Sequence, residues 1–226
     1  MKKWFLIFLF AAPFTVLAQD AIRNKSNGGF LFTKIYENDA SSVKDQGKSG
    51  TCWSFSTLSF FESELKRMGK PDVDLSEMFI VRNVYFEKVV KYVRLHGSLN
   101  LGPGGAFHDP ISILKKYGIV PELAYPANIY DETKINHGEL DEVIKAFADA
   151  IIKSKNGTLT AAWKIALNGL LDAYFGKQPD TFTFNGKSYT PTSFAQWLGL
   201  NPDNYVDITS YTHHPFYSSF ILEIPD

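Results

Sequence analysis

The order of helical and strand patterns along this 226-residue chain constrains its fold more than any other feature. Residues 51–68 carry one apolar stripe, in which Phe55, Leu58 and Leu65 step by three or four positions. This spacing puts the side chains on one face, so a buried helix is predicted there. Comparable spacing predicts further helices over residues 74–95, 106–117, 139–153, 160–175 and 193–198.

Strand patterns are concentrated near the end of the sequence. Residues 182–189 are typical of a β-hairpin, because Asn185-Gly186 suits a two-residue turn between two short strands. Further strands are expected over residues 205–209 and 220–224, and a short one within residues 30–36. Helices followed by late strands place the chain in the α+β class.

Two helix boundaries are predicted from the residues at their ends. Gly69 and Pro71 follow the first helix, and both residue types end helices. Asp74 and Glu77 have the spacing of a capping box, so the second helix is expected to start near Asp74.

Composition excludes several classes of protein. The chain is 45% hydrophobic and 21% charged, which suits a globular domain and excludes disorder or a coiled coil for the whole chain. A formal net charge of −1 provides no basic face, so nucleic acid is not expected as a partner. The single cysteine, Cys52, excludes an internal disulfide and a multi-thiolate zinc site, and neither a metal nor a cofactor is expected.

Residues 1–18 have the pattern of a cleavable signal peptide. Lys2 and Lys3 precede an apolar run over residues 4–17, and Val16 and Ala18 occupy the −3 and −1 positions before Gln19. This run is shorter than the roughly 20 apolar residues that span a bilayer, so no membrane association is expected after cleavage. The mature protein is therefore predicted to be secreted or periplasmic.

The clearest chemical signal lies between Gln46 and Phe55. Cys52 follows a glycine-bearing turn and opens the predicted helix, where free backbone N–H groups and the helix dipole favour a thiolate. A thiolate is the nucleophile that acyl transfer needs. The Gln46 side chain can reach the same point across the turn and complete an oxyanion hole, and Gly50 lets a substrate backbone approach. The alternative is a small cysteine buried in a core helix.

This stretch resembles the nucleophile motif of papain-like cysteine peptidases, in which Gln and Gly precede a Cys-Trp pair at these offsets. Thr51 stands where the family usually has Ser, and Ser49 stands where papain has a disulfide-forming cysteine. Further matches follow in the family's order and extend the resemblance over about residues 43–126: Leu75-Ser76-Glu77, Gly104-Gly105, Tyr117-Gly118-Ile119 and Tyr125-Pro126.

The resemblance implies a role for each matching position. Cys52 would be the nucleophile and Gln46 would stabilise the oxyanion, without any metal or cofactor. Four residues would bind the peptide substrate: Gly50, Trp53, Gly104 and Gly105.

The finer resemblance is to the bleomycin hydrolase and aminopeptidase C branch, in a secreted bacterial form. That branch shares the longer insert at residues 85–97 and the helical material at residues 139–175, although Phe107 replaces its usual Trp. The resemblance implies a papain-like fold with residues 19–130 as the helical domain. Residues 131–226 would form a helical insertion, a hairpin and the truncated start of the β-barrel half. It also allows a homo-oligomer.

A papain-like site needs a histidine base and an Asn or Asp that orients it. The family places this histidine about 130–150 residues after the cysteine, but residues 182–202 contain none. His96, His108 and His137 are expected to be partly exposed polar residues, and His213 and His214 are the only internal candidates. The base and its partner are therefore expected beyond residue 226, which makes the chain an N-terminal fragment.

Three functions are compatible with the sequence. The first is a cysteine peptidase, either an aminopeptidase or a general one, that hydrolyses peptide bonds through a thioester on Cys52. The second is a catalytically incomplete papain-like module that binds peptides. The third is a Cys–His cell-wall amidase, although such enzymes lack the pattern of Gln46, Cys52 and Trp53.

Overall fold

The computed structural model describes residues 21–23, 27–127, 134–154, 157–206, 208–209 and 211–220. It divides the chain into two units, Met1–Asn38 and Asp39–Asp226, of which the second holds the candidate site. The predicted signal peptide and the predicted domain boundary near residue 130 lie outside the described residues, and both stay predictions.

In the first unit, two short strands pair antiparallel. Strand β1 (Ala21–Arg23) lies beside β2 (Leu31–Thr33), with Ile22 opposite Phe32. The strand expected within residues 30–36 is therefore present, and its partner is a segment for which no strand was predicted.

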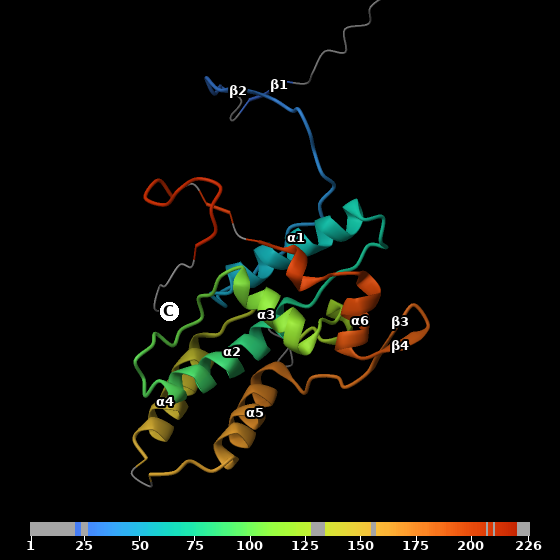
Figure 1. The fold of residues 1–226 in the computed structure, drawn as a ribbon. Coiled ribbons are helices and arrows are strands. Elements are labelled where there is room, and N and C mark those ends of the chain that lie inside the picture. The colour runs from blue at the N-terminus through green and yellow to red at the C-terminus, as the bar shows by residue number, and fades with distance from the viewer. Residues whose placement is uncertain are drawn as a thin grey trace, which may run out of the picture. The chain divides into compact units, whose positions relative to one another are not determined.

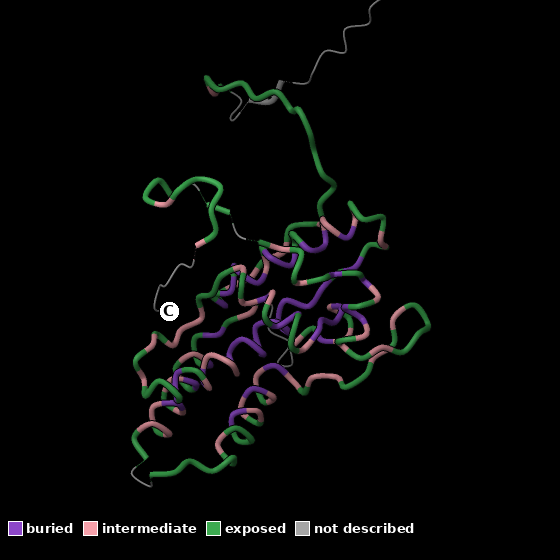
Figure 2. The backbone as a smooth tube through the Cα atoms, viewed as in Figure 1, coloured by how far each residue is buried: buried purple, intermediate pink, exposed green. Residues whose placement is uncertain are grey.

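Helix α2 (Glu77–Arg94) is the centre of the second unit. It contacts α1 (Cys52–Arg67), α3 (His108–Tyr117), α4 (Gly138–Ile152) and α5 (Ala162–Phe175), and Figure 1 shows these four helices grouped around it. Every residue from position 77 to 85 is buried, which appears in Figure 2 as a continuous purple stretch. The apolar residues of this stretch are therefore not confined to one stripe, and the polar residues Glu77, Arg82 and Asn83 are buried with them.

The start of α2 differs from the prediction. Ser76, and not Asp74, caps the helix, because the Ser76 side chain accepts a hydrogen bond of 3.1 Å from the Phe79 backbone N–H. The Asp74 carboxylate instead forms an ion pair with Lys44, and the Asp74 carbonyl accepts from the Glu122 N–H at 2.8 Å. The capping-box interpretation was wrong because a contact with a distant residue uses the carboxylate.

The other predicted helices are confirmed within a few residues at each end. The short 3₁₀ helix η1 (Glu122–Ala124) leads from α3 towards the segment before α4. Helix α6 (Pro191–Leu198) starts with a capping box between Thr190 and Ser193. None of the described helices is both long and apolar enough to cross a membrane.

The predicted hairpin is confirmed as strands β3 (Phe182–Phe184) and β4 (Lys187–Tyr189). At its turn Asn185 and Gly186 have φ angles of 48° and 75°, as a type I′ turn requires. The hairpin packs aromatic rings onto α6, with Phe182 and Phe194 centroids 5.2 Å apart.

The strand expected over residues 205–209 is wrong for the part of it that the structure describes. Its first residue, Tyr205, follows the 3₁₀ helix η2 (Pro202–Asn204) and places its ring 5.3 Å from that of Phe61 on α1. The strand expected over residues 220–224 lies mostly outside the described residues. The α+β class is confirmed, because the described residues form mostly helices together with two small two-stranded sheets.

His137 is buried, which corrects the expectation of a partly exposed residue. Only 6% of it is accessible, and its ring lies 5.2 Å from that of Phe175 and 6.0 Å from that of Tyr85. It immediately precedes α4 and so lies between that helix, α2 and α5. Burial disfavours the charged imidazolium and lowers the pKa of His137 to about 4.

Replacement of His137 by Phe should remove a pH-dependent part of the stability. Because the folded pKa lies below the usual value of about 6.5, the unfolded chain binds this proton first, and stability falls as the pH drops from 6.5 to 4. The contribution is up to about 3 kcal/mol. Urea unfolding of both proteins between pH 4 and 7 measures this contribution. The free energy of unfolding of the wild-type protein should fall relative to that of His137→Phe as the pH drops. His213→Phe, at an exposed position, is the control.

Candidate active site at the start of helix α1

Cys52 is the first residue of α1 and its thiol is exposed. Thr51 precedes the helix without a side-chain cap, and its carbonyl accepts the Ser54 N–H at 2.9 Å. Within the described part of the chain, the Cys52 N–H donates no hydrogen bond. The nucleophile predicted from the sequence is therefore accessible, beside an unpaired backbone donor at the positive end of the helix dipole.

The turn before Cys52 is held by its own side chains. Asp45 accepts a hydrogen bond from the Gly47 N–H at 2.8 Å, and the Gln46 carbonyl accepts from the Ser49 N–H at 3.3 Å. Ser49 and Thr51 are buried, and their hydroxyl oxygens lie 2.5 Å apart. Ser49 thus hydrogen-bonds within the turn at the position where papain has a disulfide-forming cysteine.

The segment before α4 supports this turn from outside. The Lys48 N–H donates to the Ile135 carbonyl at 2.7 Å, and the His137 N–H donates to the Lys48 carbonyl at 3.3 Å. Gly47 has a φ of 61°, and a Cβ on it would overlap the Ile135 carbonyl oxygen. The sequence reasoning missed this support, because no local pattern links residues almost 90 positions apart.

Gln46 and Cys52 line the same pocket of about 300 Å³, together with Phe55 and Ser56 of α1. The Gln46 side-chain oxygen is buried and accepts no hydrogen bond from the described residues. The Gln46 amide NH₂ is then available as a second donor, besides the Cys52 N–H, in the pocket that both residues line. An oxyanion that forms on a carbonyl attacked by Cys52 needs such a pair of donors.

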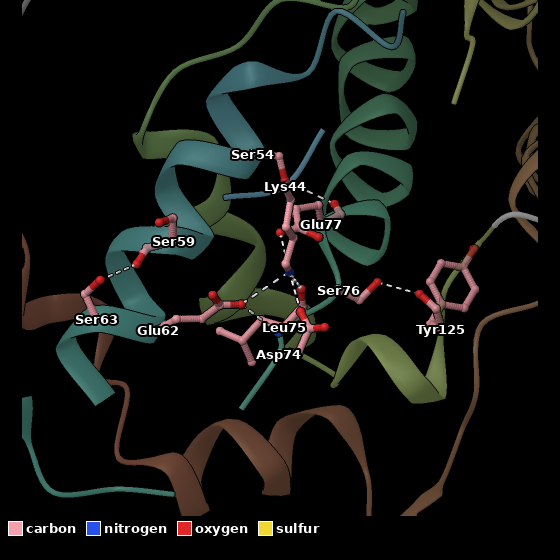
Figure 3. Close-up of polar contacts among 10 residues, drawn as sticks. All are labelled: Lys44, Ser54, Ser59, Glu62, Ser63, Asp74, Leu75, Ser76, Glu77 and Tyr125. Atoms are coloured by element: carbon pink, nitrogen blue, oxygen red, sulfur yellow. Dashed lines mark hydrogen bonds and ion pairs between the residues drawn. The ribbon is translucent and has the colours of Figure 1, made fainter. Parts of the chain in front are cut away.

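Lys44, Glu62 and Glu77 also line this pocket, and Figure 3 shows the cluster of charges centred on Lys44. Its ammonium group donates to Glu77 at 2.7 Å, to the Leu75 carbonyl at 3.2 Å and to Glu62 at 3.4 Å, and it also pairs with Asp74. Glu62 and Glu77 are 3% and 4% exposed. Glu62 in addition accepts the Leu75 N–H at 2.9 Å. Lys44 therefore joins the turn to α1 and to the start of α2.

Burial and the charges of this cluster shift the pKa values of Lys44 and of the neighbouring Glu122. Burial alone would lower the pKa of Lys44, but the hydrogen bonds that Lys44 donates to Asp74 and Glu77 outweigh burial and raise this pKa well above its usual value. Glu122 lies nearby, and its buried Oε2 atom accepts no hydrogen bond from the described residues. Burial, followed by the repulsion of Glu77, raises the pKa of Glu122 to about 7. Lys44 thus stays charged, while Glu122 changes charge near neutral pH.

The predicted substrate-binding residues also come together. The Trp53 indole N–H donates to the Pro103 carbonyl at 2.8 Å, and a Cβ on Gly105 would lie 2.7 Å from the Trp53 ring. A Cβ on Gly50 would lie 2.9 Å from the Pro103 side chain. Gly50 therefore leaves room for Pro103, rather than only for a substrate as the sequence suggested, and Gly104 is exposed at the loop's surface.

No histidine of the described chain lines the pocket beside Cys52. His96 and His108 are exposed, and His137 is enclosed by aromatic rings. The ring centroids of His213 and His214 lie 4.4 Å apart, with the rings tilted by 49°, in the segment after η2. Among the described residues, no group of three or more His, Cys, Asp or Glu side chains could hold a metal ion.

Comparison with known proteins agrees with this geometry. The family model described as "Papain family cysteine protease" matches residues 33–193. Aminopeptidase G of Lactobacillus delbrueckii subsp. lactis is 25% identical over 92% of this chain and 56% of its own length. Aminopeptidase C of Listeria monocytogenes is 28% identical over 76% of this chain and 45% of its own length.

A solved structure shows the same fold. The crystal structure of PepW from Lactobacillus rhamnosis matches with a TM-score of 0.53 and 23% identity, over 74% of this chain and 46% of that one. This chain spans about half the length of the curated relatives it matches.

Replacement of Lys44 by Met should destabilise the protein strongly. The change leaves Glu62 and Glu77 buried without their cation, which costs about 3–5 kcal/mol. Urea unfolding at pH 7 measures the loss, and the double variant Lys44→Met/Glu77→Gln should recover part of it. Lys66→Met is the matched control, because Lys66 pairs with the exposed Asp72 and such a pair contributes at most about 1 kcal/mol. An equal loss in the two single variants would contradict the assigned role of the cluster.

Proposed function

The chain belongs to the papain family of cysteine proteases, and we propose that the protein hydrolyses peptide bonds with Cys52 as its nucleophile. One observation carries the proposal: the exposed Cys52 thiol shares a pocket with Gln46, and the Cys52 N–H has no partner among the described residues. The chemistry of acyl transfer requires this combination of a thiolate and two converging donors.

The proposed reaction has two steps. The Cys52 sulfur attacks the carbonyl carbon, and the Cys52 N–H and Gln46 NH₂ stabilise the oxyanion. Collapse of this intermediate releases the amine, which takes a proton, and leaves a thioester on Cys52. Water then hydrolyses the thioester and regenerates the thiol. A general base must accept and return the protons in both steps.

The proposed mechanism also requires a histidine as the general base. Because no described histidine lines the pocket, we expect the histidine and its Asn or Asp partner in the part of the relatives' length that this chain does not span. A peptide-binding module without a base is the second candidate, and the same lack of a described histidine favours it. No observation favours a cell-wall amidase.

We further propose that the substrates are peptides with a free amino terminus. The supporting observation is that the relatives named above are aminopeptidases C and G, and the substrate class comes from those names. Secretion or a periplasmic location is proposed on the pattern of residues 1–18, and mass spectrometry of the mature protein should then find Gln19 at its amino terminus.

Two substitutions in the full-length protein test the proposed chemistry. Cys52→Ala should abolish hydrolysis of aminoacyl fluorogenic amides, because no thioester can form. Gln46→Ala should lower kcat/KM by about 10²–10³, through loss of one oxyanion donor. Acetylation of the substrate's amino group should abolish cleavage if the enzyme is an aminopeptidase.

The control for these variants is Ser63→Ala, on the same helix. The Ser63 hydroxyl bonds to the Ser59 carbonyl of its own helix, so activity should not change. Turnover by the Cys52→Ala protein would disprove the peptidase mechanism, and binding without turnover by the wild-type protein would instead identify the peptide-binding module.

A further inference from the structure

Residues 101–106 form a loop that lies in the connection between α2 and α3. They include Gly104 and Gly105, which the proposed function places against the substrate. We propose that Lys88 of α2 is the positioning residue for this loop, so that Gly105 presents its backbone to a bound peptide. The inference rests on the proposed function and adds a residue to which neither the sequence motifs nor the relatives' names assign a role.

Lys88 holds two carbonyl groups of the loop at once. Its ammonium group donates to the Gly102 carbonyl at 3.3 Å and to the Gly104 carbonyl at a shorter distance. A charged donor forms stronger hydrogen bonds than a neutral one, and here it approaches the loop from a buried helix. The contact therefore fixes two peptide groups on either side of Pro103.

Trp53 of α1 binds the carbonyl between them. Its indole N–H donates to the Pro103 carbonyl at 2.8 Å, and the Trp53 ring fills the space where a Cβ of Gly105 would lie. Donors from two helices therefore occupy three successive carbonyls, those of Gly102, Pro103 and Gly104. With these groups paired, the loop cannot turn them toward a ligand.

The backbone N–H and carbonyl of Gly105 are not paired in the way that these three carbonyls are. Gly105 is exposed, and no described residue forms a hydrogen bond with its N–H or carbonyl. The next N–H, that of Ala106, donates to the Asp109 carboxylate at 2.9 Å. Gly105 is therefore the position where an extended peptide can pair with the loop, and fixed neighbours determine where its groups point.

The base of the loop rests on the helical insertion. Leu101 and Gly102 line a small pocket with Tyr85 of α2 and with Asp141 and Ile144 of α4. The Tyr85 hydroxyl donates to Asp141 at 3.1 Å. Lys88 lies about one helical turn after Tyr85, so the same face of α2 supports the base of the loop and its glycines.

Within these residues a disulfide cannot fix the loop, because Cys52 is the only cysteine. Ser49 occupies the position at which papain has a disulfide-forming cysteine. The loop is attached instead through the hydrogen bonds of Lys88 and Trp53.

The test compares two reagents that alkylate Cys52 in the full-length protein. Iodoacetamide needs only the thiol, whereas a dipeptidyl diazomethyl ketone must first pair its backbone with the loop. In the Lys88→Met protein the second-order rate constant for the dipeptidyl reagent should fall about tenfold, as expected when a charge-assisted hydrogen bond is lost. The rate with iodoacetamide should stay at the wild-type value.

Two further variants separate positioning from general damage. Lys88→Arg keeps the charge and the donors, so it should restore most of the rate with the dipeptidyl reagent. Lys145→Met removes a lysine that bonds to Asp149 on its own helix α4, and it should change neither rate.

Each outcome has a distinct meaning. A wild-type rate with the dipeptidyl reagent in Lys88→Met, or an equal fall with both reagents, overturns the role of Lys88. If the wild-type protein itself reacts with the dipeptidyl reagent no faster than with a diazomethyl ketone that lacks the dipeptide, the proposed function fails first. A selective loss that Arg restores supports the inference.

Discussion

The ammonium group of Lys44 compensates charges that the fold could not otherwise bury. Glu62 of α1 and Glu77 of α2 are almost inaccessible, and carboxylates in such positions persist only with a partner and hydrogen bonds. Lys44 is also two residues before Gln46. The interaction that allows α1 and α2 to pack with acidic side chains between them therefore also fixes the peptide segment that leads to Gln46 and Cys52.

Helix α2 connects this charge cluster to the rest of the site. Its first residue is Glu77, its middle carries Tyr85 and its next turn carries Lys88. One helix thus contributes Glu77 to the lining of the Cys52 pocket and Lys88 to the attachment of the Gly104–Gly105 loop. The segment at Ile135 and His137, which supports the turn before Cys52, packs against the same helix through Tyr85. Helix α2 therefore contacts several parts of the site that are distant from one another in the sequence.

Local patterns were enough to predict most of the elements, because the apolar residues of the helices recur at helical spacing and the hairpin turn needs Asn-Gly. The predictions failed where a distant partner decides the outcome. Asp74 has the spacing of a cap, but its carboxylate pairs with Lys44, and Ser76 caps the helix instead. His137 is buried because Tyr85 and Phe175 enclose it. Residues 205–209 alternate as a strand would, but the ring of Tyr205 packs on α1. For the site, the motif indicated Cys52, Gln46 and the glycines, whereas Lys44 and Lys88 act through contacts that no short motif contains.

The way the Gly104–Gly105 loop is attached affects how the protein responds to its redox surroundings. A catalytic thiol has to be kept reduced, and the reductants that protect it also open disulfides. Here hydrogen bonds from a lysine and an indole fasten the loop, so reductants do not act on its attachment. The same surroundings can therefore keep Cys52, the single thiol of this chain, reduced and leave this part of the framework unchanged.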